Sequence, residues 1–321
     1  MELNVFEKAR KAYEEFQFKN VNEKIIYDFY NLLSENKNEI EKICNIEKNY
    51  CNLYKTIENV LNKPESLRNI TNVIEERKRE DGFIIGKYRE SIGVIGVIFN
   101  GDPYVTVEVA KKAITTKNAV VFCTNDKMYA ITNLLAIYFG KALELNNCPK
   151  DIIQVINDKD YEEIFKHNNI IDKIVVVGNR NLQTKVIAKS RVEVITSGYN
   201  CFDMYIEDIM DAELIKKILS TENIELNVYV NTNISKEEIE ELGIEEYTEV
   251  ESVEECIRDI NINSGKYSSS IFTKKGENAN KFLKLVKSRN VFVNASPTAE
   301  RSLDIGKGKF VYTKQVLFSN H

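Results

Sequence analysis

The stretch IGVIGVIFNGDPYVTVEVAKKAITTKNAVVFC, residues Ile92 to Cys123, decides the fold. It begins with an unbroken apolar run, Ile92 to Phe99, which is typical of a strand buried on both faces. A breaker cluster, Asn100 to Pro103, separates this run from a helical pattern over Val105 to Thr116. A second apolar run, Asn118 to Cys123, then follows. This order predicts two parallel strands joined by a right-handed helical crossover.

The same alternation continues along the chain. Further strands are expected at 151–156, 173–178 and 192–196, with helices at 128–145, 161–167 and 182–190. Strands that alternate with helices predict an α/β protein with a doubly wound, mostly parallel, Rossmann-type sheet. After Asp208 a second and smaller α/β region is expected, with helices at 211–220, 236–242, 253–262 and 277–287 and strands at 226–230, 268–273, 290–295 and 310–313.

The first 80 residues contain mainly helical patterns. Apolar residues recur at helical spacing among charged ones in three segments, 5–18, 21–40 and 67–80. None of these segments contains a recognisable chemical motif. We therefore expect a helical layer that serves packing or oligomer formation.

Composition excludes several classes of function. The 44 basic and 49 acidic residues give a net charge of −5, which argues against binding nucleic acid through phosphate contacts. The chain contains no apolar run of about 20 residues, and its first residues lack the apolar core of a secretory signal. We therefore expect a cytoplasmic protein with neither a nucleic acid nor a membrane as partner.

Cysteine and histidine usage narrows the chemistry further. Six cysteines occur without a CxxC pair, a pattern that indicates reduced thiols. Only His167 and the terminal His321 are available, so a histidine-based metal site or a Ser-His-Asp triad is not expected. No metal site is predicted.

The expected ligand site lies in the loops that follow the first two strands, because ligands of doubly wound sheets bind beyond the carboxyl ends of the strands. These loops span 99–106 and 124–126. Neither GxGxxG nor a P-loop motif is present. Gly93 and Gly96 lie inside the first strand, and we expect them to allow close packing of a helix on the sheet.

Four blocks in this chain resemble segments of the γ-glutamyl phosphate reductases, a family within the aldehyde dehydrogenase superfamily. The first is GVIGVIF at Gly93 followed by PYVTV at Pro103 and NAV at Asn118. The others are GYNCFDMYIED at Gly198, IRDININSGKYSSSIFT at Ile257, and FLKLVKSRNVFVNAS at Phe282 with its following GKGKFVYTKQ. The blocks keep the family's order and span residues 90 to 320.

The resemblance implies a Rossmann-type cofactor lobe and a catalytic lobe. It implies reduction of an acyl phosphate by NADPH through a cysteine thiohemiacetal, so NADP or NAD is the expected cofactor. It also implies a homodimer. The expected organisation is a helical layer (1–85), the cofactor lobe (86–208), a reduced lobe of catalytic type (209–295) and a C-terminal return and oligomerisation strand (296–321).

Five polar residues are the candidates for cofactor binding. They lie in the two loops at the sheet edge or match the family's motif positions: Asn100, Thr106, Asn118, Thr124 and Asn125. Thr106 also begins the predicted helix, where a threonine commonly serves as a cap.

This chain departs from the family where the family's chemistry takes place. The family's reactive cysteine follows the GNCHVYVDE-like block, yet there is no cysteine here between Cys201 and Cys256. Tyr104 replaces the asparagine of the family's RPNVT, and Cys123-Thr124-Asn125 replaces its RGG. The departures predict that the scaffold is kept while the nucleophile segment is lost.

Three hypotheses follow. The first is an impaired or non-catalytic homologue that still binds NAD(P). The second is a working reductase of acyl phosphates or thioesters that uses Cys201 or Cys123 as the nucleophile. The third is a structural or regulatory subunit without a cofactor. We favour the first, because the losses concern the catalytic segments.

Overall fold

The computed structural model describes residues 4–46, 73–99, 102–159, 161–221, 224–300, 303 and 305–318. The chain forms two compact units. The first contains residues 1–176, 187–195 and 305–321, and the second contains residues 177–186 and 196–304. Each unit is built on a five-stranded sheet, so the α/β fold class is confirmed. Among the described residues, no helix is long and apolar enough to cross a membrane.

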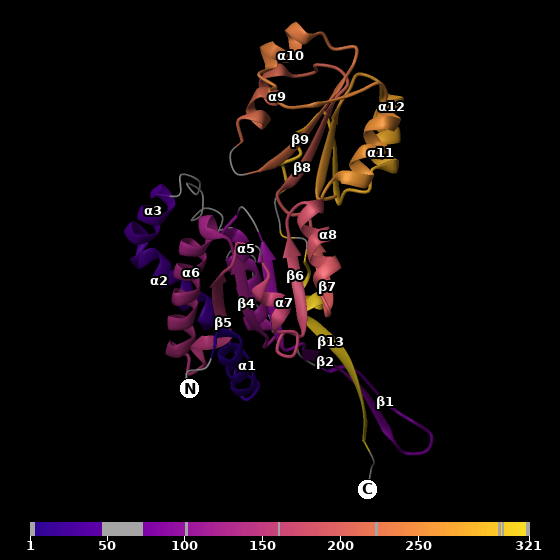
Figure 1. Cartoon of the computed structure of the whole chain (residues 1–321). Helices are drawn as coiled ribbons and strands as arrows, with labels where there is room; N and C mark the ends of the chain where they lie inside the picture. Colours follow the sequence, from indigo (N-terminus) through magenta and orange to yellow (C-terminus); the bar gives the residue numbers. More distant parts are fainter. Residues whose placement is uncertain are drawn as a thin grey trace. The chain divides into compact units, whose positions relative to one another are not determined.

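The first five-stranded sheet has the order β5-β4-β3-β6-β7 (Figure 1). Its strands are β3 (Val94–Phe99), β4 (Ala119–Thr124), β5 (Ile153–Asn157), β6 (Lys173–Val177) and β7 (Glu193–Ser197). The connecting helices are α5 (Tyr104–Thr115), α6 (Asp126–Leu145), α7 (Glu163–Lys166) and α8 (Arg180–Lys189), with a short 3-10 turn η2 (Lys150–Ile152) before β5. Successive strands move outward from β3 in one direction and then from β6 in the other, which is the doubly wound order that the sequence predicts.

The central strands are buried along their whole length. Every residue of β3 and of β4 is buried, which explains why each reads as an uninterrupted apolar run. At Gly96 a methyl group in place of the hydrogen would come within 2.5 Å of Ile164 Cδ1 on α7. The expected role of Gly96 in close helix–sheet packing is therefore confirmed.

The N-terminal helices are α1 (Val5–Phe16), α2 (Lys24–Glu35) and α3 (Lys37–Ile46). The single helix expected over 21–40 is thus two helices. Asn36 separates them, and its side-chain amide donates to the Leu32 carbonyl at 2.7 Å. Helix α1 packs over β3, β4 and β5, where Arg10 forms an ion pair of 2.6 Å with Asp172.

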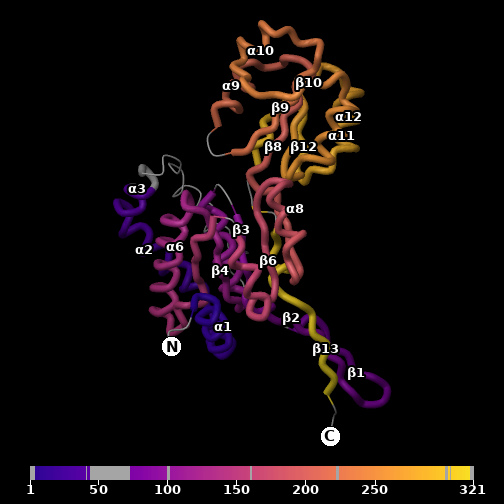
Figure 2. Tube along the Cα trace, in the orientation of Figure 1, coloured from indigo at the N-terminus to yellow at the C-terminus, as the bar shows by residue number. Residues whose placement is uncertain are grey.

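A separate three-stranded antiparallel sheet has the order β1-β2-β13 (Figure 2). Its strands are β1 (Val73–Lys78), β2 (Ile84–Ser91) and β13 (Val311–Phe318). The helix predicted over 67–80 is therefore wrong from residue 73 onward, and its first residues lie outside the described ones. All six residues of β1 are exposed, so no alternation of buried and exposed side chains was available to distinguish the strand. The final strand, expected over 310–313, is present as β13 and extends to Phe318.

The second unit contains a parallel sheet of order β10-β9-β8-β11-β12. Its strands are β8 (Cys201–Ile206), β9 (Glu225–Asn231), β10 (Thr248–Val250), β11 (Ser268–Phe272) and β12 (Asn290–Val293), and its helices are α9 (Ala212–Leu219), α10 (Lys236–Leu242), α11 (Val253–Asn263) and α12 (Gly276–Leu285). The expected lobe boundary at residue 208 lies after β8, whereas β8 is the central strand of this second sheet.

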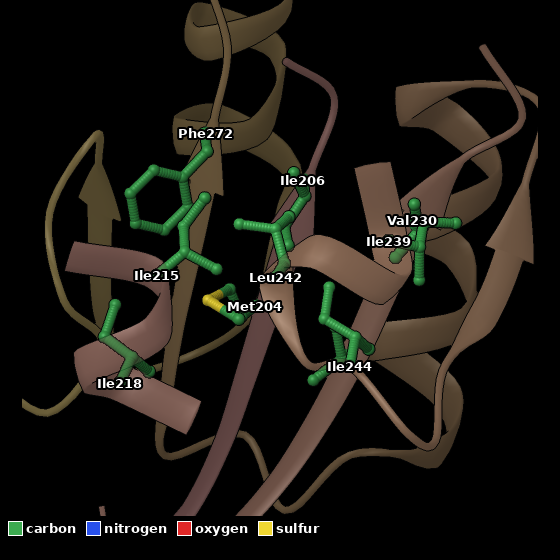
Figure 3. Close-up of a cluster of buried hydrophobic side chains, with 10 residues drawn as sticks. Met204, Ile206, Ile215, Ile218, Val230, Ile239, Leu242, Ile244 and Phe272 are labelled. Atoms are coloured by element: carbon green, nitrogen blue, oxygen red, sulfur yellow. The ribbon is translucent and has the colours of Figure 1, made fainter. Parts of the chain in front are cut away.

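Two hydrophobic clusters cover the faces of the second sheet. Met204 and Ile206 of β8 contribute to the cluster under α9 and α10 (Figure 3). Tyr205, between them in sequence, contributes to the cluster under α11 and α12. This alternation is the period of two that a strand imposes on its side chains. The second lobe is therefore a sheet covered on both faces.

Candidate functional site

The site suggested by the sequence lies at the carboxyl edge of the first sheet. There β4 ends at Thr124 and β5 at Asn157, and these two residues are register partners. The Asp158 backbone N–H donates to the Thr124 carbonyl at 2.9 Å, which holds the two strand ends together. Parallel strands end at one edge, so the polar residues that follow β3, β4 and β5 share this edge.

Two threonine hydroxyls are buried at this edge. Thr106 in the first turn of α5 and Thr124 at the end of β4 are both fully buried. Neither hydroxyl has a hydrogen-bond partner within the described part of the chain. A buried polar group without a partner costs stability, so such groups commonly mark a place where a ligand or water is bound. The expected cap role of Thr106 is wrong, because α5 begins after Pro103.

The N-terminus of α6 adds a helix end to this edge. The Asn125 side chain accepts a hydrogen bond of 3.3 Å from the Met128 N–H, which caps the 20-residue helix. Asp126 occupies the first turn, and its carboxylate accepts a hydrogen bond of 2.8 Å from the side-chain amide of Asn157. The Asp158 carboxylate accepts a hydrogen bond of 2.6 Å from the Glu163 backbone N–H. The edge therefore combines a helix N-terminus with two carboxylates, and the sequence analysis did not identify Asp158 as part of it.

Of the remaining two residues predicted to bind the cofactor, the structure describes Asn118 but not Asn100. Asn118 precedes the first residue of β4, so it lies at the opposite, amino edge of the sheet. Its side-chain oxygen Oδ1 accepts a hydrogen bond of 2.9 Å from the Gly93 N–H, and its side-chain nitrogen Nδ2 donates one of 2.7 Å to the Phe310 carbonyl. The side chain of Asn118 thus joins three segments of the fold, and it lies away from the carboxyl edge where the other candidates meet. Asn100 lies outside the described residues.

Neither candidate thiol is in an environment that activates cysteine. Cys123 is fully buried, and burial raises the pKa of its thiol far above the usual range, with further contributions from Asp158 and Glu163. Burial likewise raises the pKa of Cys201, and Glu225 adds to this rise while accepting the thiol's hydrogen bond at 3.7 Å. A reactive cysteine requires the opposite shift. Both thiols are therefore held in the unreactive protonated form.

Cys201 is also at the wrong end of its strand. It is the first residue of β8, whereas ligands of parallel sheets bind beyond the last residues of the strands. The other described cysteine side chains, Cys148 and Cys256, are buried too, and burial raises the pKa of each thiol. All four described thiols are thus unactivated.

A second polar edge, which the sequence analysis missed, lies in the second unit at the ends of β8 and β11. Glu207, only 7% exposed, accepts hydrogen bonds from the Thr273 hydroxyl, from Lys275 at 3.1 Å and from Asn278 at 2.6 Å. This is the switch point of the second sheet, where ligands commonly bind. Here the bonds join the chain's own loops, so Glu207 has a structural role.

The first edge fits a dinucleotide better than a metal ion. The Thr106 and Thr124 hydroxyls and the two carboxylates suit ribose hydroxyls, which both donate and accept hydrogen bonds. Within the described residues, no group of three or more histidine, cysteine, aspartate or glutamate side chains is arranged to hold a metal ion.

Comparison with known proteins identifies relatives of this chain. Residues 3–197 match the model of the aldehyde dehydrogenase family. The γ-glutamyl phosphate reductase of Dictyoglomus thermophilum is 26% identical over 84% of this chain and 76% of that protein. The same enzyme from a Thermoanaerobacter species is 29% identical over 68% of this chain and 65% of its own length.

Solved structures show the same fold. The γ-glutamyl phosphate reductase of Thermotoga maritima aligns over 99% of this chain and 98% of its own, with a TM-score of 0.65 and 19% identity. An NAD-dependent benzaldehyde dehydrogenase from Corynebacterium glutamicum aligns over 99% of this chain and 88% of its own, with a TM-score of 0.72 and 14% identity.

Proposed function

This chain belongs to the aldehyde dehydrogenase family and resembles γ-glutamyl phosphate reductases, and from this premise we propose that it is an NAD(P)-binding homologue whose covalent catalytic step is impaired or lost. The observation that carries the proposal is the state of the thiols. Cys123 and Cys201, the two candidate nucleophiles, are both buried with raised thiol pKa values. A thiohemiacetal requires an exposed thiolate.

The cofactor proposal rests on the carboxyl edge of the first sheet. The Thr106 and Thr124 hydroxyls would bind a sugar or phosphate oxygen, and the N-terminus of α5, which follows the first strand of the βαβ unit, would face a phosphate. Bound NAD(P)H would supply a hydride.

The same edge favours NAD over NADP. Asp126 follows the second strand of the βαβ unit, where an acidic side chain accepts hydrogen bonds from the ribose and repels a 2′-phosphate. Asp158 adds a second carboxylate there. Lys127 follows Asp126, but consecutive helix residues point about 100° apart. We therefore propose NAD(H) as the preferred cofactor, in contrast to the NADPH implied by the resemblance.

A homodimer is proposed from the three-stranded sheet. Both β1 and β13 are edge strands of this sheet. They expose apolar side chains, among them Ile74, Leu317 and Phe318. Exposed apolar strand edges readily pair with another chain. Light scattering of the wild-type chain and of Leu317→Glu tests this proposal, which predicts a dimer for the first and a monomer for the second.

The decisive experiment combines cofactor titration with a turnover assay. Calorimetry with NADH and NADPH should show saturable binding, with a dissociation constant near ~1 μM corresponding to about −8 kcal/mol. NAD(P)H oxidation with γ-glutamyl phosphate should show little or no turnover. Turnover that is abolished by Cys123→Ala or Cys201→Ala would overturn the proposal. Absence of binding at millimolar cofactor would leave the structural subunit as the function.

Thiol alkylation provides an independent check. Iodoacetamide should modify Cys123 and Cys201 at least ~10-fold more slowly in the folded chain than in urea, because the thiolate is the reactive form. If turnover is observed, alanine variants of all six cysteines, including Cys44 and Cys51, identify the thiol responsible.

A further inference from the structure

An open groove of about 380 Å³ lies in the first unit, beside the edge of its five-stranded sheet. One wall is a face of α6, and the other is the segment that runs from η2 into β5. The volume falls in the range of about 300–1,000 Å³ that is usual for ligand sites. None of the described lining residues belongs to the carboxyl edge proposed for the cofactor, so the groove needs an explanation of its own.

The strand that lines the groove has an open side. Within the described residues β5 pairs only with β4. The Asp158 N–H bonds to the Thr124 carbonyl, and in a parallel ladder alternate residues direct their backbone groups to the same neighbour. Ile153 and Val155 therefore direct their N–H and C=O groups into the groove. The Ile153 carbonyl there accepts a hydrogen bond of 3.3 Å from the Gln154 side-chain amide.

The α6 wall presents a polar, an apolar and a cationic side chain in turn. Asn133, Ile137 and Lys141 line the groove at four-residue intervals, so they share a face and follow one another at about 6 Å along the helix axis. Alternate residues of an extended strand are about 6.6 Å apart. A strand laid beside β5 would therefore place every second side chain next to one of these three residues.

The charges of the groove favour an acidic partner at Lys141. Glu144 and Lys150 form an ion pair of 3.0 Å with each other, and the Asp151 carboxylate accepts a hydrogen bond of 3.1 Å from a neighbouring side chain. Lys141 forms no ion pair within the described part of the chain, and its ammonium lies 5.0 Å from the centre of the Tyr138 ring. A carboxylate would complement this exposed cation.

We propose that this groove binds an extended peptide of a partner protein, which pairs with β5 as an additional strand and presents an acidic side chain to Lys141. Antiparallel pairing is the more stable arrangement per residue. An antiparallel peptide runs in the direction of α6, so its pattern from N- to C-terminus is polar–x–apolar–x–acidic. The backbone groups of β5 supply affinity, and the three α6 side chains select the sequence. The inference goes beyond the proposed function and requires neither a cofactor nor a thiol.

The test is a titration of the full chain with two fluorescently labelled peptides, one containing Gln-Thr-Val-Thr-Glu and the other Gln-Thr-Val-Thr-Lys. Fluorescence anisotropy should show saturable binding of the acidic peptide, at least ~5-fold tighter than that of the basic one. Strand pairing is tested by methylating the backbone nitrogens of the acidic peptide at its two threonines, or at its other three residues. One set should weaken binding at least ~10-fold and the other should be tolerated, because only alternate N–H groups face β5.

A charge reversal places the peptide in the groove. Lys141→Glu should reverse the preference between the two peptides. Lys216→Glu makes the same change of charge at an exposed position of α9 and should leave the preference unchanged.

The proposal is overturned by equal affinities of the two peptides for the wild-type chain, by a preference that persists in Lys141→Glu, or by no saturable binding up to about 1 mM peptide. Equal effects of the two methylation patterns would contradict strand pairing. A lower mass of Lys141→Glu than of wild type in light scattering would show that a second copy of this chain fills the groove, which would also overturn the proposal.

Discussion

Asp203 and Ser269 are direct register partners on the neighbouring strands β8 and β11, and the Ser269 hydroxyl donates to the Asp203 carboxylate at 2.8 Å. Asp203 is only 1% exposed, and its carboxylate also accepts a hydrogen bond of 3.0 Å from the Asn227 side-chain amide. Burial raises the pKa of Asp203 to about 6, and hydrogen bonds from Asn227, Ser269 and Ser264 offset part of that rise. An ionisable group therefore lies in the centre of the second unit.

This group makes stability depend on pH. The pKa of Asp203 is higher in the folded chain than in the unfolded one, so the folded state favours the protonated form. The corresponding stability is complete below pH ~4 and is lost as the pH rises through about 6. The shift corresponds to roughly 3 kcal/mol. Asp203→Asn should remove this dependence.

Urea unfolding at pH 4.5 and 7.5 measures the effect. The difference in unfolding free energy between wild type and Asp203→Asn should change by roughly 2 kcal/mol or more between the two pH values, in favour of the variant at pH 7.5. Glu249→Gln, at an exposed position of β10, is the control and should show no such change. A constant difference would contradict the raised pKa.

Asp126→Asn should weaken the preference for NADH over NADPH. The carboxylate at the start of α6 repels the 2′-phosphate, so its loss should narrow the ratio of the two dissociation constants by about 5-fold or more. Calorimetric titration with both cofactors measures the ratio. Glu144→Gln is the matched control, because Glu144 lies near the other end of the same helix and pairs with Lys150 on the surface. An unchanged ratio in Asp126→Asn would remove this residue from the cofactor site.

Thr124→Val should weaken cofactor binding while leaving the fold intact. Valine has the shape of threonine, and the Thr124 hydroxyl has no partner within the described residues. Its loss should therefore leave the free protein equally stable or up to about 1–2 kcal/mol more stable, and reduce cofactor affinity by about 2- to 12-fold.

Thr132→Val provides the control for this substitution. Thr132 is buried in α6, and its hydroxyl also lacks a partner among the described residues. The variant should share the effect on thermal stability and leave cofactor affinity unchanged. Equal affinity losses in both variants would show a general effect of the substitution.

Gly198→Ala should severely destabilise the second unit. A methyl group at Gly198 would come within 2.0 Å of the Gly265 carbonyl oxygen, a backbone atom that cannot move aside. The expected cost is about 2–4 kcal/mol. Gly308→Ala, where no atom lies within 4 Å, should be close to neutral. Thermal unfolding by circular dichroism distinguishes the two variants.

The sheet strands were predictable because their signal is local. The runs that became β3, β4 and β6 are continuous and apolar, and a strand covered on both faces requires such a run. By contrast, β1 is exposed at every residue and was mistaken for a helix. Its strand conformation comes from pairing with β2, a contact that has no signature in the residues of β1 alone.

The site was predictable only in part, for a similar reason. Thr124 and Asn125 follow a recognisable strand, so their place at the carboxyl edge could be read directly from the chain. Asn118 matched a family motif, but its amide bonds to Phe310, 192 residues away in sequence. Motif position therefore suggested a ligand where the fold uses the side chain as a structural link.

By itself, the sequence determined the α/β class, the order of strands and helices, and the family resemblance, because burial periodicity and motif spacing depend on near neighbours in the chain. Tertiary structure alone decided the surroundings of the polar groups. Within the described residues it left the Thr106 and Thr124 hydroxyls without a hydrogen-bond partner, and it buried the Cys123 and Cys201 thiols, which raises their pKa values. Such properties depend on desolvation and on charges contributed by distant segments, and these exist only once the chain has folded.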